Sequence, residues 1–207
     1  MRKGIKILGK VLSTILLLLI FSPIAITLVL NIEPVQNAVV KRASNYASNL
    51  LGTDIYIEGV DFDLFSKIRV RGLYVEDYNK DTLLYVPHAT ATIKSLNLSN
   101  DGFKFSGVRM YETKFYLREL ASGELNIHPL IEQLRGSEEQ SNFRLYIDDI
   151  DAEGLSMRYE RIEQRASSAD LDLSNIQINN IDTHLANFAI VRGAVWTDIE
   201  HLSAVER

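Results

Sequence analysis

Residues that commonly carry enzyme or metal chemistry are few in this chain. The sequence has four histidines and no cysteine. The histidines are widely separated and follow neither an HExxH pattern nor a paired spacing, so they do not predict a zinc site. They are His88, His128, His184 and His201. Without cysteine the chain has no disulfide and no thiolate nucleophile. These residues predict no metal site and no cofactor.

Acidic and serine-containing motifs are the other candidates for chemistry in this chain. Asp148, Asp149 and Asp151 form the densest acidic group, and calcium is the cation that such oxygens would suit. The group lacks the ligand spacing of an EF-hand, so a solvated strand edge is the better interpretation. Ser106-Gly107 and Ser122-Gly123 lack the G-x-S-x-G frame of a nucleophile elbow. The sequence therefore predicts a protein that is not an enzyme.

Composition and charge indicate a folded protein that does not bind nucleic acid. A chain of 207 residues that is 46% apolar and 24% charged is typical of a folded protein. The first 32 residues carry four basic side chains and no acid, a charge of +4. The net charge of the chain is −5, so the remaining residues carry −9. An acidic body without a basic stripe does not favour nucleic-acid binding, because phosphate neutralisation needs clustered Lys and Arg.

The N-terminal segment predicts a membrane anchor. No charge occurs from Val11 to Ile32, a run of 22 residues, which is enough for a helix to cross about 30 Å of hydrocarbon. The basic residues before this run predict a cytoplasmic N-terminus and a body on the opposite side. A signal peptide cleaved near Ala25 is the alternative. We therefore expect residues 1–32 to form a cytoplasmic basic tail and a transmembrane anchor.

Residues 33–52 predict an amphipathic helix. Pro34 suits the first helical turn, and Gly52 suits the left-handed position just past the end. The apolar side chains recur at helical spacing on one face. They are Val35, Ala38, Val39, Ala43, Tyr46, Ala47, Leu50 and Leu51. This face either packs on the first strands or also plugs one end of a lipid-holding sheet.

Residues 53–207 predict a mainly β body. From Thr53 to Asp77 apolar and polar residues alternate with period two, and the phase slips at Gly59 and Gly72, as it does at β-bulges. Similar glycine-centred phrases recur around Gly107 and Gly154. We expect an elongated, curved, antiparallel-type sheet of roughly ten strands that forms an open, repeating β-groove. A closed sandwich or barrel is the alternative.

Three local features punctuate this pattern. Pro87 predicts an edge strand or a strand start, because proline cannot donate a ladder hydrogen bond. A short helix is expected to begin near Pro129. The polar, acidic stretch 136–142 is the best candidate for a mobile insertion.

The order of these elements resembles the N-terminal portion of the TamB branch of the AsmA-like family. The matching segments are PVQNAVVKRASNYASNLLG, DIYIEGVDFDLFSKIRVRGLYVEDYNKDTLLYV, GELNIHPLIEQL and LSAVER. The resemblance implies a diderm envelope protein, anchored in the inner membrane, whose repeating β-groove extends through the periplasm. It also implies a role in phospholipid movement toward the outer membrane and in outer-membrane protein assembly. An outer-membrane β-barrel partner would be met through C-terminal regions absent from this sequence, which we read as the start of a longer protein.

Three functions remain open from the sequence. The leading hypothesis is a non-enzymatic conduit for phospholipid acyl chains. The others are a lipid-free scaffold that augments client β-strands and a membrane-tethered binding domain with a closed β-sandwich. For the conduit, the predicted lipid-binding residues are the apolar members of the alternation. They are Ile55, Ile57, Val60, Phe62, Val70, Leu73, Val75, Ile93, Phe105, Val108, Met110, Leu145 and Ile147.

Overall fold

The computed structural model describes residues 2–63, 66–97, 102–135, 143–161, 174–191 and 194–204. The predicted mobile insertion at 136–142 lies outside these residues. The elements follow in the order α1 (Arg2–Leu30), α2 (Glu33–Leu51), β1 (Ile55–Phe62), β2 (Lys67–Glu76), β3 (Thr82–Asn97), β4 (Gly102–Tyr111), β5 (Lys114–Glu119), α3 (His128–Arg135), β6 (Arg144–Arg161), β7 (Asn175–Val191) and β8 (Ala194–Ala204). The protein is mainly β, as the alternation predicted.

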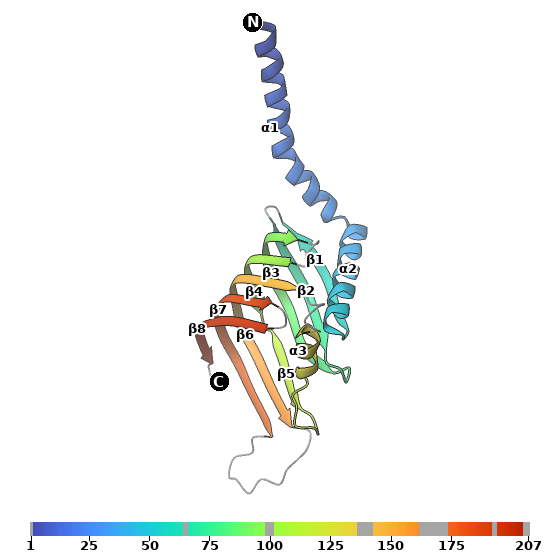
Figure 1. Ribbon diagram of the computed structural model, residues 1–207, viewed down its shortest axis with the longest axis vertical. Coiled ribbons are helices and arrows are strands. Elements are labelled where there is room, and N and C mark those ends of the chain that lie inside the picture. Colours follow the sequence, from blue (N-terminus) through green and yellow to red (C-terminus); the bar gives the residue numbers. More distant parts are fainter. Residues whose placement is uncertain are drawn as a thin grey trace.

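Helix α1 projects away from the sheet (Figure 1). Its segment Gly9–Leu30 is long and apolar enough to cross a membrane, and none of it is buried within the protein. The helix begins earlier than the uncharged run, because the basic residues that precede this run are also good helix formers. A single-pass anchor is consistent with this helix.

Helix α2 has the predicted boundaries. Proline occupies its first turn, and Gly52 follows its end with a φ of 67°, donating its backbone N–H to the Ser48 carbonyl at 2.8 Å. The Ser48 hydroxyl also meets the backbone of Ile55, accepting from its N–H at 2.9 Å. Helix α2 thereby satisfies part of the outward-facing backbone of β1.

The eight strands form one mixed sheet in the order β1-β2-β3-β4-β6-β7-β8, and β5 pairs with both β3 and β6. The expectation of an antiparallel-type sheet was wrong in one respect: β6 pairs in parallel with β4 and β5. After β5 the chain returns through α3 to the end of the sheet where β4 begins. Strand β6 therefore runs in the same direction as β4.

The expectation for Pro87 was also wrong. It lies in the middle of β3, an interior strand of the sheet. The ladder between β2 and β3 pairs Arg71 with His88 and Leu73 with Val86, so Pro87 lies level with Gly72 where no pair forms. An amide hydrogen is not needed at this point, and an interior strand tolerates proline there.

Gly72 marks the expected phase slip in β2. Its φ is 59°, and a Cβ added there would collide with the Glu58 carboxyl group on β1. Both the left-handed backbone and the close approach require glycine. The slip lets Leu73 and Val75 face the same side as Val70 on the other half of the strand.

A small core lies where the two short helices meet the sheet. Ile55, Val75, Leu83 and Leu130 are its buried members, each at most 7% exposed. Ala47 and Leu51 of α2, Leu73, Leu84, Phe115 and Ile127 pack around them. One end of the apolar sheet face is therefore covered by α2 and α3.

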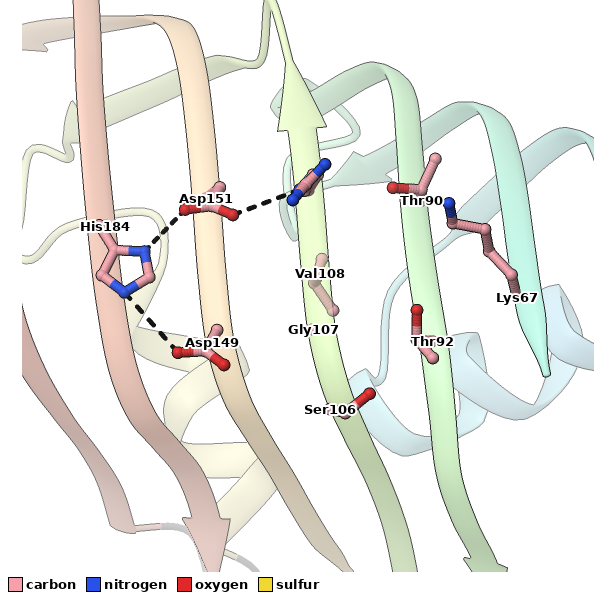
Figure 2. A pocket seen from close by; sticks show the side chains of 10 residues that line it. Lys67, Thr90, Thr92, Ser106, Gly107, Val108, Asp149, Asp151 and His184 are labelled. Carbon is pink, nitrogen blue, oxygen red and sulfur yellow. Dashed lines mark hydrogen bonds and ion pairs between the residues drawn. The ribbon is translucent and has the colours of Figure 1, made fainter. Parts of the chain in front are cut away.

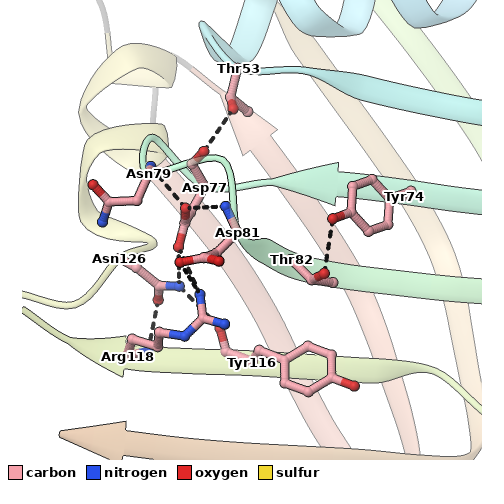
Figure 3. Close-up of polar contacts among 9 residues, drawn as sticks. All are labelled: Thr53, Tyr74, Asp77, Asn79, Asp81, Thr82, Tyr116, Arg118 and Asn126. Carbon is pink, nitrogen blue, oxygen red and sulfur yellow. Dashed lines mark hydrogen bonds and ion pairs between the residues drawn. The ribbon is translucent and has the colours of Figure 1, made fainter. Parts of the chain in front are cut away.

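A buried carboxylate fixes α3 to the sheet (Figure 3). Asp77, which is 1% exposed, accepts hydrogen bonds from the backbone N–H groups of Asn79 and Asp81 at 2.9 and 3.0 Å. Asn126 Nδ2 donates to the same carboxyl group at 2.9 Å, and Arg118 Nη1 lies 3.4 Å from it. The turn between β2 and β3 is thus joined to the segment that leads into α3.

Candidate functional site

Residues that lie directly opposite one another on neighbouring strands project from the same face of a sheet. The register places apolar side chains opposite one another across most of this sheet. One such row consists of Ile68, Ala91, Val108, Ile150, Leu185 and Ile199. A second row consists of Ile93, Phe105, Ile147 and Phe188. A third consists of Phe103, Leu145, Ile190 and Val195. We call the surface that these rows make the apolar face.

A bulge keeps the first two rows on one face. Ala91 and Ile93, two residues apart on β3, pair with Val108 and Phe105, which are three residues apart on β4. Ser106 and Gly107 therefore both lie between the two apolar residues of β4, opposite a single residue of β3, and both belong to the opposite face of the sheet. Strand β6 matches this spacing, since Phe105 pairs with Ile147 and Val108 with Ile150.

The predicted lipid-binding residues differ in how far they are covered. Ile55, Val60, Val75 and Ile147 are buried, at 5%, 5%, 7% and 9% exposure. The remaining nine are half-buried, and they are Ile57, Phe62, Val70, Leu73, Ile93, Phe105, Val108, Met110 and Leu145. Ile55 and Val75 belong to the small core, which α2 and α3 cover.

The apolar face has no second sheet over it in the described part of the chain. Each strand makes its extensive contacts with its neighbours in the sheet, and β1 also contacts α2. Tyr46 of α2 approaches Phe103 with 5.9 Å between the ring centroids, and Phe103 approaches Phe143 at 6.0 Å. These rings line the apolar face beside α2. Side chains such as Phe105 and Val108 stay partly open to solvent.

The opposite face, which we call the polar face, carries charged pairs. Arg71 and Asp61 are 2.7 Å apart, and Lys94 and Asp148 are 2.6 Å apart. Such exposed pairs contribute little stability, at most about 1 kcal/mol each. They keep one side of the sheet hydrated while the other side stays apolar.

Within the polar face, His184 lies among three carboxylates (Figure 2 shows two of them). Its Nδ1 is 2.7 Å from Asp151 Oδ1, and its Nε2 is 3.7 Å from Asp149 and 3.4 Å from Glu200. The hydrogen bond with Asp151 raises the pKa of His184 above its ordinary value, although partial burial opposes the shift. Arg109 also pairs with Asp151, at 3.4 Å. The arrangement is a charge network across β4, β6, β7 and β8.

Sequence reasoning missed several members of this site. Phe103, Ile150, Phe188 and Leu185 belong to the apolar rows and were not among the predicted lining residues. Their alternation was readable, and only the strand register places them beside the predicted ones.

No spacing signal could have paired His184 with Asp149 and Asp151, because β6 and β7 are joined through a long connection. In the described ranges, no group of three or more His, Asp or Glu residues could hold a metal ion.

The sheet can bind an apolar ligand on its apolar face while its polar face stays hydrated. Searches against family models and against curated proteins found no match for this chain.

Proposed function

We propose that this chain is a single-pass inner-membrane protein, similar to the TamB branch of the AsmA-like family, whose periplasmic sheet holds and conducts phospholipid acyl chains. The N-terminus would lie in the cytoplasm. Lipids would move along the apolar face toward the outer membrane, supporting envelope and outer-membrane protein assembly. An outer-membrane β-barrel partner would be met through C-terminal regions of the kind that the family carries.

One observation supports this proposal above the others: in the described part of the chain the apolar rows run across the sheet with most of their side chains only partly buried and with no second sheet over them. Leaving such a surface in water is costly, whereas each buried CH₂ of an acyl chain contributes about 0.8 kcal/mol. Binding of this kind is non-directional, so neighbouring rows offer similar environments. A chain could slide along them without a catalytic group.

Site-specific photo-cross-linking tests the proposal. A photoreactive amino acid replaces Phe105 on the apolar face or, as the matched control, Lys104 on the polar face of the same strand. The protein is expressed in a bacterial envelope, irradiated and analysed by mass spectrometry. We expect phospholipid adducts at position 105 and few at position 104. Equal yields at both positions, or adducts to protein segments alone at 105, would contradict the conduit.

A second candidate is a scaffold that extends client β-strands. Strand β8 forms one edge of the sheet in the described part, and its Val195, Trp196, Ile199 and Leu202 are 51–66% exposed. An exposed edge strand can pair with an extended peptide. Cross-links from β8 to unfolded outer-membrane proteins, together with none to lipid at position 105, would favour this function over the conduit.

A further inference from the structure

A hollow lies on the polar face, across β2, β3, β4 and β6 (Figure 2). Its volume is about 350 Å³. Its floor is Gly107, where an added Cβ would meet no atom within 4 Å. Gly107 does not have a positive φ, so neither backbone conformation nor packing requires glycine there. Glycine weakens a strand interior, and its presence here leaves the hollow open.

The register orders the groups around this hollow. Lys67 lies directly opposite Thr92, and Thr92 lies directly opposite Gly107. Because β4 and β6 keep a constant offset from Phe105 to Val108, Gly107 lies level with Asp149. A positive charge and a negative charge therefore end a row that spans three strand spacings, about 14 Å between Cα atoms.

Several polar groups of this row have unused hydrogen-bonding capacity. In the described part of the chain, the Lys67 ammonium has no carboxylate within ion-pairing distance, and the Thr90, Thr92 and Ser106 hydroxyl groups have no hydrogen-bond partner in the protein. Among the described residues, the Asp149 carboxylate has one charged partner, His184 Nε2, at 3.7 Å. The neighbouring charges are already engaged, since Arg109 and His184 both contact Asp151. The free capacity is cationic at one end and anionic at the other.

We propose that this hollow binds a small zwitterion whose oxyanion meets Lys67 and the threonine hydroxyl groups and whose ammonium group meets Asp149. Lys67 and Asp149 stand at opposite ends of the row, so the middle of the ligand would pass over Gly107. Phosphoethanolamine has this chemistry, both as a free compound and as a phospholipid headgroup. The site lies on the face opposite the apolar rows and does not depend on the function proposed for them.

The test uses the full chain in maltoside micelles, titrated with O-phosphoethanolamine by isothermal calorimetry. We expect saturable binding that weakens at least tenfold in Gly107→Val, which fills the hollow, and in Asp149→Asn. Lys67→Gln removes the positive charge at one end of the row, and because Lys67 is exposed this variant should preserve the fold. Ser156→Val, in a separate hollow of the polar face, is the matched control and should bind normally. Inorganic phosphate and ethanolamine should each bind at least tenfold more weakly.

Absence of saturable binding, full affinity in Gly107→Val, or equal binding of phosphate alone would overturn the proposal. Repeating the titration in nanodiscs separates the two sources of the ligand. Reduced affinity for the free probe in phosphatidylethanolamine discs, relative to phosphatidylglycerol discs, supports the site and assigns it to a lipid headgroup. Equal affinity in both supports the site and assigns it to a soluble zwitterion.

Discussion

The side-chain amide of Asn31 pairs with the backbone of Phe62 through two hydrogen bonds. Asn31 Nδ2 donates to the Phe62 carbonyl at 2.6 Å, and the Phe62 N–H donates to Asn31 Oδ1 at 3.1 Å. Asn31 follows the last residue of α1, and Phe62 is the last residue of β1. The Asn31 carboxamide therefore joins the end of the apolar helix α1 to β1, using the two backbone groups that a neighbouring strand would use.

Replacing Asn31 with alanine is expected to loosen this joint. The two hydrogen bonds together contribute about 1–3 kcal/mol. Hydrogen exchange at the Phe62 amide should accelerate at least tenfold, measured by mass spectrometry in detergent. Gln36→Ala, which removes a side-chain contact to Asn31 and Asp61 without touching the Phe62 backbone, is the control. Unchanged protection of Phe62 in Asn31→Ala would contradict the role of the carboxamide.

Gly72→Ala is expected to destabilise the sheet. A non-glycine residue at its φ of 59° costs about 1–2 kcal/mol, and the collision with Glu58 adds to this. Urea denaturation would measure the loss. Adding Glu58→Ala should recover only the collision part. Gly107→Ala, where the added Cβ meets open space, is the control and should leave stability unchanged or slightly higher. Equal effects of the two glycine variants would contradict this interpretation.

Asn126→Ala should destabilise the attachment of α3. Asn126 is 2% exposed, and its amide joins Asp77, the Tyr116 carbonyl and the Arg118 N–H. Leaving these buried partners unsatisfied costs about 2–3 kcal/mol. Thermal unfolding monitored by circular dichroism would detect the loss. Asn79→Ala provides the comparison, because Asn79 contributes only its backbone N–H to the network. The prediction fails if both variants melt together.

Phe105→Glu should abolish lipid binding and leave the sheet folded. Phe105 is half-buried in an uncovered row, so a charge there remains accessible to water while repelling acyl chains. Phospholipid that copurifies with the protein would be quantified by mass spectrometry. Lys104→Glu places the same charge on the polar face and should retain the lipid. Loss of the folded circular dichroism signal in Phe105→Glu alone would instead indicate a dry core.

Stability should fall as pH rises through the folded-state pKa of His184. Its hydrogen bond with Asp151 raises the pKa, so the folded protein holds this proton more tightly than the unfolded chain, whose value is about 6.5. The stabilisation is fully present below the unfolded pKa and is lost above the folded one. Denaturation between pH 5.5 and 8.5 would show the slope. His184→Gln should remove that part of the slope, and an identical slope in the variant would refute the assignment.

Local sequence signals predicted the helices and the phase slip well. Pro34 and Gly52 bounded α2, and Gly72 marked the phase slip through its left-handed backbone, because each of these residues has a backbone preference that acts over one or two positions. The strand pairing was not predictable in the same way. The parallel return of β6 beside β4 depends on where α3 and the chain after it lead, and Pro87 was misread because its tolerance depends on the partner strand at Gly72.

The candidate site shows the same division. Alternation identified Phe105, Val108 and Ile147 as apolar members of their own strands, since period two is a property of a single strand. It could not show that α2 and α3 cover Ile55 and Val75 while leaving Phe105 partly open. The network around His184 joins residues from four strands, and only the three-dimensional register brings them together.

The Ser48 hydroxyl and the Asn31 carboxamide accept hydrogen bonds from the outward-facing backbone N–H groups of Ile55 and Phe62, near the two ends of β1. An edge strand whose outward-facing backbone groups are free can pair with the edge strand of another copy. Head-to-tail stacking of the sheets needs a free β1 edge in every copy, so these two short side chains oppose edge-to-edge polymerisation of the protein.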